Sequence, residues 1–582
     1  MRKNIIFAAI VALLAAVAVP SRAEEPEDDS KMNLNAIARA IELYCNVYKE
    51  LNFNYVDTID NKKAAETAIN AMLREIDPYT DFIPDRDTEA FFTHSSGEYG
   101  GIGSIIMAAP DGGVLISSPY EGSPAAKSGL KAGDKILKID DDTVATWSTD
   151  KVSARLKGLP DTKIKVTVKR PWTDDSILTF DIVREKIFVS SVPYYGVLKG
   201  NIGVIVIDSF KEKTPQEVRA ALEALKKNPA VKYIVLDLRG NGGGLLDSAV
   251  QVVGMFVPKG TEVLTTRGRE KKSEKIYKTT QNPIDTEIPL AVFIDGGTAS
   301  ASEIVSGALQ DLDRAVILGA RSFGKGLVQT TIPISENDGM LKVTTAKYYI
   351  PSGRLIQAID YSHRNVDGSV ERIPDSLTTV YKTRNGREVR DGGGITPDVK
   401  IDYPKYNQLL YNIANGNWIF NFATRFAAEH PTIAAPEDFV ITDEIFEQFK
   451  ASIDPDKLDY DKVCEVSLTN FKEIVKTQGY DNDSTAIIFA QLEHLLKHDL
   501  NKDIDLNRVE ISRALESEIL SRYYYQRGES VAYLKNDNTL DKAAEIFNTE
   551  GEWERMLNPE VKRKSKVVTG PSSKVPRRLL KK

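Results

Sequence analysis

The spacing of hydrophobic and polar positions changes along the chain, and each change predicts a different kind of structure. From residue 24 to about 95, apolar residues such as Ile37 and Ile41 recur at helical spacing. From about 96 to 185, short β-branched segments such as residues 163–168 alternate apolar with polar positions, which favours half-buried strands. The chain is therefore expected to begin with a helical segment, followed by a compact β-rich module.

Residues 186–403 alternate near-continuous apolar runs with helical segments. The runs at 202–207 and 234–238 are typical of strands buried on both faces of a parallel sheet. Between them, the motif from Thr214 to Glu217 predicts a helix start with a capping box and an early proline. Residues 404–560 return to helical spacing. We expect a multidomain α/β protein with helical regions at both ends.

The first 23 residues predict an export signal. Arg2 and Lys3 precede an apolar run over residues 5–19, and the small residues around Ala23 suit cleavage after that position. The run is shorter than the roughly 20 residues that a transmembrane helix needs. The mature protein is expected to be exported, most simply to a periplasm, with an uncleaved signal that holds it at a membrane as the alternative.

Composition and charge exclude several classes of protein. The chain has 582 residues, of which 42% are hydrophobic and 27% charged, as in folded multidomain proteins. Its net charge is −7, and the nine Lys and Arg of residues 561–582 leave −16 on the rest. We expect residues 561–582 to form a basic, flexible tail, with a membrane-surface or nucleic-acid contact as the alternative. An acidic body disfavours nucleic acid as a partner. Two distant cysteines build no disulfide framework or Cys-rich metal site, and we expect neither metal nor cofactor.

Residues 295–303 form a small-residue turn between a buried strand and an apolar helix. Such a turn would place Ser300 at a helix N-terminus, where unpaired N–H groups and the helix dipole favour developing negative charge. Ser300 is therefore a candidate nucleophile. A structural interpretation remains open, because Ser300 and Glu303 also have the spacing of a capping box.

A serine nucleophile needs a base, and histidine is scarce. Only His363 lies in the α/β segment, in a polar loop, which disfavours a Ser-His-Asp triad. Lys325 stands between Gly324 and Gly326, and a lysine can serve as a base when burial lowers its pKa. The alternative is a solvated lysine in a turn. Residues 319–325 also match the spacing of a P-loop, but Gly326 stands where that motif needs Ser or Thr to hold magnesium. A nucleotide site is therefore disfavoured.

The glycine-rich segment 237–244 ends a second buried strand. Successive glycines let backbone N–H groups approach a bound carbonyl, so this segment could supply an oxyanion donor. A tight turn without chemistry explains it equally well.

Taken together, these motifs resemble the carboxy-terminal processing proteases, or tail-specific proteases, which are serine peptidases of the S41 family with a PDZ module and a Ser-Lys dyad. The resemblance extends from about residue 46 to 400. The segments that carry it, in family order, are 77–80, 100–103, 123–136, 238–244, 298–303, 322–329 and 344–353.

The resemblance implies a role for particular residues. Ser300 would be the nucleophile, Lys325 its base 25 positions later, and Gln329 the residue that orients the lysine. The oxyanion would be held by the N–H groups of Gly243 and Ala301. The residues expected near a substrate's carboxylate are Gly101, Ile102, Gly103 and Ser104. The PDZ module would span residues 96–185 and the protease core 186–403.

The expected function is a serine endopeptidase that recognises disordered apolar C-terminal tails of exported proteins through its PDZ module and cleaves at or near them. A non-catalytic PDZ scaffold that binds such tails is the main alternative. A conventional esterase is a third interpretation and would need His363. The C-terminal helical region, 404–560, is a candidate contact for a second copy or an adaptor.

Overall fold

The computed structural model describes residues 33–173, 177–335, 338–361, 364–365, 369–403, 407–458, 463–496 and 499–560, without the side chains of His94 and Val463. The chain divides into two compact units, the first ending at Met72 and the second beginning at Leu73. The predicted signal peptide, the basic tail and His363 lie outside the described residues.

The first unit contains α2 (Leu34–Asn54) and most of α3 (Asn61–Arg74). The side chain of Asn33 accepts the N–H of Ala36 and caps α2. The hydroxyl of Tyr48 donates to the carbonyl of Asn61 over 2.8 Å and joins the two helices. The helical spacing of this segment is thus confirmed.

The second unit opens with β1 (Asp81–Ile83) and α4 (Asp85–Ser96), which lead into the β-rich module. Strands β2 (Glu98–Gly101) and β9 (Glu185–Phe188) pair antiparallel and hold the two ends of the module together. Its main sheet has the order β3-β4-β5-β7-β8, with β6 beside β5. The elements between β2 and β9 are β3 (Ser104–Ala108), β4 (Val114–Pro119), α5 (Pro124–Ser128), β5 (Lys135–Ile139), β6 (Asp142–Thr143), α6 (Thr149–Leu156), β7 (Lys163–Lys169) and β8 (Ile177–Val183).

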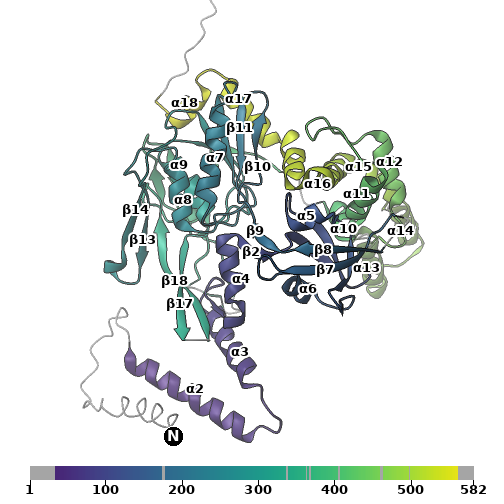
Figure 1. The fold of residues 1–582 in the computed structure, drawn as a ribbon, viewed down its shortest axis with the longest axis horizontal. Helices are drawn as coiled ribbons and strands as arrows, with labels where there is room; N and C mark the ends of the chain where they lie inside the picture. Colours follow the sequence, from purple (N-terminus) through teal and green to yellow (C-terminus); the bar gives the residue numbers. More distant parts are fainter. Residues whose placement is uncertain are drawn as a thin grey trace, which may run out of the picture. The chain divides into compact units, whose positions relative to one another are not determined.

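A six-stranded sheet forms the centre of the α/β core (Figure 1). Its order is β10-β11-β12-β15-β16-β21, parallel throughout except for the first pair. The strands are β10 (Tyr194–Leu198), β11 (Ile202–Val206), β12 (Tyr233–Asp237), β15 (Leu290–Ile294), β16 (Val316–Gly319) and β21 (Val399–Lys400).

Helices cover both faces of this sheet. One face packs on α7 (Thr214–Lys226), α8 (Leu246–Val253) and α9 (Ala301–Asp311). The opposite face packs on the end of α16 (Arg508–Lys535), α17 (Asn538–Asn548) and α18 (Glu552–Leu557). Burial on two sides explains the near-continuous apolar runs of these strands. The C-terminal region therefore supplies a layer of the core itself.

One local prediction in this layer is wrong. Thr214 is the first residue of α7 rather than its cap, and its hydroxyl accepts the N–H of Lys211. Glu217 does not reach back to the helix start; its carboxylate accepts hydrogen bonds from Ser190 and from the backbone of Ser191. A nearby backbone N–H has replaced one half of the expected capping box, and partners distant in sequence have replaced the other half.

A second sheet brings together strands from both sides of the β-rich module. Its order is β1-β18-β13-β14, with β17 paired to β18. β1 precedes the module in the chain and pairs antiparallel with β18, so residues 77–80 are carried to the α/β core. Besides β1, the strands of this sheet are β13 (Glu262–Gly268), β14 (Lys275–Lys278), β17 (Leu327–Ser335) and β18 (Gly339–Tyr349). The short elements nearby are the helices η1 (Lys271–Ser273) and η2 (Asp375–Leu377) and the paired strands β19 (Val380–Lys382) and β20 (Glu388–Arg390).

The C-terminal region is helical, as expected. A separate apolar cluster holds α10 (Gln408–Asn415), α11 (Trp418–Glu429), α12 (Asp443–Ser452), α15 (Leu500–Leu506) and the first part of α16. Helices α13 (Val463–Thr477) and α14 (Asp483–Leu496) pack on each other and keep most of their apolar side chains exposed. The fold class predicted from the sequence is confirmed.

Candidate active site

Ser300 sits in the turn between β15 and α9, directly before the first residue of the helix. Its backbone has φ 56° and ψ −116°, a conformation that costs a non-glycine residue free energy. The side chain is half-buried, at the N-terminal end of an otherwise buried helix. A strained serine at a helix N-terminus is an arrangement that presents a hydroxyl to a substrate.

Glu303 links the Ser300 turn to the Lys325 turn. Its side chain is fully buried, and one carboxylate oxygen accepts the N–H groups of Ser300 and Lys325 at 2.9 and 2.8 Å. The other oxygen accepts the hydroxyl of Ser322 and the N–H of Gly324 at 2.5 and 2.7 Å. Burial raises the pKa of this carboxyl, and the four donors oppose that rise. Glu303 therefore does more than cap α9.

The amine of Lys325 lies in a half-buried position against an aromatic ring. Its Nζ is 4.2 Å from the centroid of the Tyr79 ring. Burial, aided by the positive charge of Lys342, lowers the pKa of Lys325 to about 8, although Asp77 and Glu303 act in the opposite direction. A substantial fraction of this amine is therefore neutral at mildly alkaline pH, as a general base requires.

Residues 77–80 hold Tyr79 in place. Asp77 is buried, and its carboxylate accepts the N–H groups of Tyr79 and Thr80 at 2.8 and 2.7 Å. The hydroxyl of Thr80 accepts the N–H of Thr344, and the side chain of Gln329 donates to the Thr344 hydroxyl at 3.1 Å. Gln329 thus lies in the same network, where it contacts Thr344.

The two candidate oxyanion donors, the N–H groups of Gly243 and Ala301, differ in whether they are already hydrogen-bonded. Gly243 has φ +104° and packs so closely that a Cβ there would lie 2.7 Å from the Cβ of Ser300. Its N–H, however, donates to the side-chain oxygen of Asn241 at 2.9 Å. The N–H of Ala301 has no hydrogen-bond acceptor within the described part of the chain. One donor is therefore free beside Ser300 and the other is engaged.

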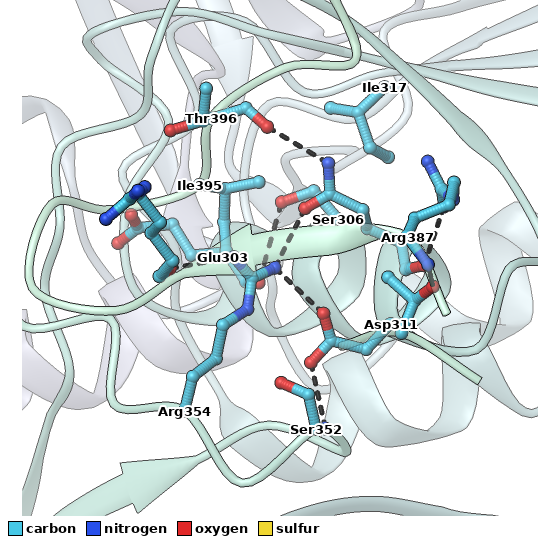
Figure 2. A network of polar contacts seen from close by, with 12 residues as sticks. Glu303, Ser306, Asp311, Ile317, Ser352, Arg354, Arg387, Ile395 and Thr396 are labelled. Atoms are coloured by element: carbon cyan, nitrogen blue, oxygen red, sulfur yellow. Dashed lines mark hydrogen bonds and ion pairs between the residues drawn. The ribbon is translucent and has the colours of Figure 1, made fainter. Parts of the chain in front are cut away.

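The far end of α9 is fixed by a buried polar network (Figure 2). Arg354, which is fully buried, donates to Asp311 and to the side chain of Gln310, both at 2.8 Å. Asp311 also accepts the N–H of Ser352, and Gln310 donates to the carbonyl of Thr396. Figure 2 shows Arg354 and Ser352 converging on Asp311. The helix that begins after Ser300 is thereby held rigidly at its other end.

Comparison with known proteins identifies the family. The chain is 38% identical over 362 residues to the carboxy-terminal-processing protease of Bartonella bacilliformis, covering 62% of this chain and 81% of that protein. The family model described as peptidase family S41 matches residues 201–363. This chain belongs to peptidase family S41. It is a serine peptidase, as the sequence predicted.

Further matches cover other parts of this S41 peptidase. A PDZ domain model matches residues 115–170, and a model for the probable PDZ-protease C-terminal helical domain matches 409–547. A probable CtpA-like serine protease of Staphylococcus aureus is 31% identical, covering 70% of this chain and 72% of that protein. The solved photosystem II D1 C-terminal processing protease is 27% identical with a TM-score of 0.34, covering 62% of this chain and 92% of that one.

The PDZ residues named from the sequence lie where β2 leads into β3. Ile102 is buried and its carbonyl accepts the N–H of Ala125, while the carbonyl of Gly103 accepts that of Tyr120. Gly101 ends β2 and Ser104 begins β3. The hydroxyl of Ser104 is buried without a hydrogen-bond partner among the described residues. Within the described ranges, β3 is the terminal strand of its sheet, so one of its edges has no strand partner. Helix α6 contacts β3.

Sequence reasoning missed three side chains of this site. Glu303 was interpreted only as a capping residue, and Tyr79 only as part of a family motif. Tyr348, a buried residue of β18, donates its hydroxyl to the carbonyls of Ser300 and Lys325 at 3.2 and 2.8 Å. The burial pattern of a strand predicts that such a tyrosine is buried. It does not predict which carbonyls the hydroxyl contacts.

Within the described ranges, no three or more His, Cys, Asp or Glu side chains are grouped as a metal ion requires. No described helix combines the length and apolar character needed to cross a bilayer.

Proposed function

We propose that this S41 peptidase hydrolyses peptide bonds with Ser300 as nucleophile and Lys325 as general base. The observation that carries the proposal is the bridge through Glu303, which accepts the backbone N–H groups of both residues. Burial that brings the pKa of Lys325 to about 8 supports its role as the base. Gln329 contributes through its bond to Thr344, on the strand that also carries Tyr348.

The reaction would proceed in two stages. Neutral Lys325 takes the proton of Ser300 while the serine oxygen attacks the peptide carbonyl, and the carbonyl oxygen becomes an oxyanion beside the N–H of Ala301. Gly243 becomes the second donor when its N–H turns from Asn241. Protonated Lys325 gives its proton to the nitrogen of the leaving amine as the intermediate collapses, which leaves an ester on Ser300 and a neutral Lys325. Water, deprotonated by Lys325, then hydrolyses that ester and restores the enzyme.

Substrate tails would be recognised at the free edge of β3. An extended peptide can add a strand to an unpaired sheet edge through backbone hydrogen bonds. The turn from Gly101 to Gly103 stands at the start of that edge, and the unpartnered hydroxyl of Ser104 offers a donor to the terminal carboxylate. We expect disordered, apolar tails to bind best, since they supply an extended backbone and apolar side chains.

We also propose that the substrates are exported proteins. The support is the predicted signal at residues 1–23, because an exported peptidase meets exported proteins, most simply in a periplasm. The mass of the protein purified from an exporting host tests whether the peptidase itself is exported and its signal removed. A mass that begins at Glu24 supports export and cleavage, and an uncleaved chain in the membrane fraction supports the anchored alternative.

The proposed dyad is tested by comparing the protein from Glu24 onward with its Ser300→Ala and Lys325→Ala variants. Each is incubated with a reporter that carries a disordered apolar C-terminal tail, and products are followed by intact mass. Cleavage by the parent alone is expected. Equal cleavage by all three would show that the wrong residues were chosen. Binding of the tail by all three without cleavage would favour the scaffold interpretation.

A further inference from the structure

An aspartate of the C-terminal helical region pairs with the glycine-rich loop that carries Gly243. Asp537, which precedes α17, accepts a hydrogen bond from Nη2 of Arg239 at 2.6 Å. Arg239 also pairs with Asp237 at 2.6 Å. The side chains of Arg239, Asp237 and Asp537 are only 3%, 4% and 7% exposed, so water screens these interactions little.

The guanidinium of Arg239 is held from several sides. It lies between the rings of Phe293 and Tyr533, 5.1 and 4.8 Å from their centroids. Its Nη1 donates to the hydroxyl of Thr539 on α17 at 3.3 Å. Three of its four partners beyond Asp237 come from the C-terminal region: Tyr533 from α16, Asp537 from the segment that joins α16 to α17, and Thr539 from α17. The C-terminal region therefore determines where this side chain lies.

The loop that follows Arg239 packs directly on the Ser300 turn. The N–H of Gly240 donates to Asp295 at 2.9 Å, and the carbonyl of Asn241 accepts the N–H of Ala299 at 3.0 Å. The same carbonyl accepts the hydroxyl of Ser302 at 2.9 Å. A shift of Arg239 would therefore be transmitted to the spacing between Gly243 and Ser300, on which oxyanion stabilisation depends.

The charges around Asp537 explain why its carboxylate can act to position the loop and not only to stabilise the fold. Asp237 and Arg239 form a neutral pair within the loop, so loss of the Asp537 charge leaves no unpaired buried cation. Asp537 also accepts the N–H of Thr539 as the cap of α17, a bond that asparagine can also accept. Asp537→Asn therefore removes the charge while it retains the cap.

We propose that Asp537 is a positioning residue of the active site, through which the C-terminal helical region holds Arg239 and the Gly243 loop against the Ser300 turn. This proposal rests on the proposed function, because it assigns the loop to oxyanion binding. It makes the C-terminal region part of the catalytic apparatus in addition to being a structural layer.

The test compares Asp537→Asn with Asp541→Asn in the full mature chain. Asp541 lies on α17 and pairs with Lys199 at 2.6 Å, but it is 57% exposed and makes no hydrogen bond or ion pair with the loop among the described residues. We expect Asp537→Asn to lower kcat about tenfold or more with KM nearly unchanged, since small misplacements of catalytic groups can cost up to about a hundredfold. Asp541→Asn should match the parent.

Three further variants separate positioning from folding. Asp537→Glu should recover part of the lost kcat, because it restores the carboxylate. Tyr533→Leu, at a residue that is 57% exposed, should lower kcat in the same direction without a fall in the thermal midpoint. In an Arg239→Met background, Asp537→Asn should have no further effect on kcat.

Equal kcat in Asp537→Asn and Asp541→Asn overturns the proposal, and so does an additive effect in the Arg239→Met background. Ser300→Ala is measured beside these variants. Cleavage by Ser300→Ala would mean that the proposed function has failed, whereas an inactive Ser300→Ala with a fully active Asp537→Asn refutes only the positioning role.

Discussion

At the scale of single residues, the chemistry of this site depends on burial. A lysine in water has a pKa near 10.4 and is almost wholly protonated at neutral pH. Lys325 departs from that value because its amine is half-buried against Tyr79 and near the charge of Lys342. The same environment leaves Glu303 fully buried as an acceptor of four hydrogen bonds. The sequence names both residues, and their environment supports the roles proposed for them.

The cleavage rate should fall as Lys325 is protonated. With a pKa of about 8, the neutral fraction of the amine, and with it kcat/KM, is expected to decrease about tenfold for each pH unit below 8. The measurement is a pH profile on the tailed reporter from pH 5 to 10. A rate undiminished between pH 8 and pH 5 would contradict a lysine base.

Lys342 offers an independent check of the same electrostatics. Its positive charge helps to lower the pKa of Lys325, so Lys342→Met should raise that pKa and move the alkaline rise of the profile to higher pH. The matched control is Lys347→Met, which removes a charge from the same strand at a residue that does not contribute to the shift. Identical profiles for the two variants would show that Lys342 has no such influence.

Replacement of Glu303 should damage both stability and catalysis. In Glu303→Gln, an amide N–H₂ must face N–H or hydroxyl donors in a fully buried position. A buried donor left without an acceptor costs about 1 to 3 kcal/mol, and we expect a loss of that size in the free energy of unfolding together with a lower kcat. Denaturant titration and steady-state kinetics measure the two effects.

The control for Glu303→Gln is Ser306→Ala, which removes a buried hydroxyl bonded within α9. It should cost less stability and leave kcat near that of the parent. If Glu303→Gln behaved like this control, the bridge between the two turns would be unimportant.

At the scale of elements, α13 and α14 differ from the other helices of the C-terminal region. They pack on each other, and α14 exposes Ile487, Ile488 and Leu495 at 60%, 56% and 76%. Adjacent exposed apolar side chains of this kind often mark a protein contact. The homo-oligomer or adaptor contact expected in the C-terminal region stays a prediction, and this pair of helices is where it is best tested.

We expect the double variant Ile487→Glu, Leu495→Glu to lower the mass of the particle measured by sedimentation, because buried carboxylates would disfavour an interface between copies. Val440→Glu, at an exposed residue outside these helices, is the control and should retain the parent mass. A parent that sediments as a single chain would contradict self-association through α14.

At the scale of the whole molecule, the peptidase core depends on a segment that begins more than a hundred residues after its last strand. Val204, Val235 and Phe293 on one face of the central sheet pack against Leu540 and Phe547 of α17. Each large apolar side chain contributes about 1.5 to 3 kcal/mol when buried. This layer therefore cannot be removed as an independent domain.

A chain that ends at residue 403 should consequently lose its soluble fold. The exposed sheet face would aggregate, which soluble yield and circular dichroism would reveal. Deletion of α13 and α14 with a short linker should preserve folding, since neither helix belongs to an apolar core cluster of the described residues. A soluble, cooperatively folded chain of residues 24–403 would contradict this dependence.

The sequence by itself determined the elements and the chemistry that local patterns encode. Apolar runs located the buried strands, and the turns around Ser300 and Lys325 were recognisable from small residues and their spacing. The S41 family and the fold class were predicted correctly from motifs in order. The domain boundaries and the roles of the named site residues stay predictions.

Only the tertiary structure decided which distant groups meet. It paired Glu217 with Ser190 in place of the expected capping box, brought Tyr79 to Lys325, and joined Asp537 to Arg239. Periodicity shows that a face is buried and a motif shows which residue types are present. Neither encodes the partner, because side chains far apart in sequence become neighbours only when the chain has packed.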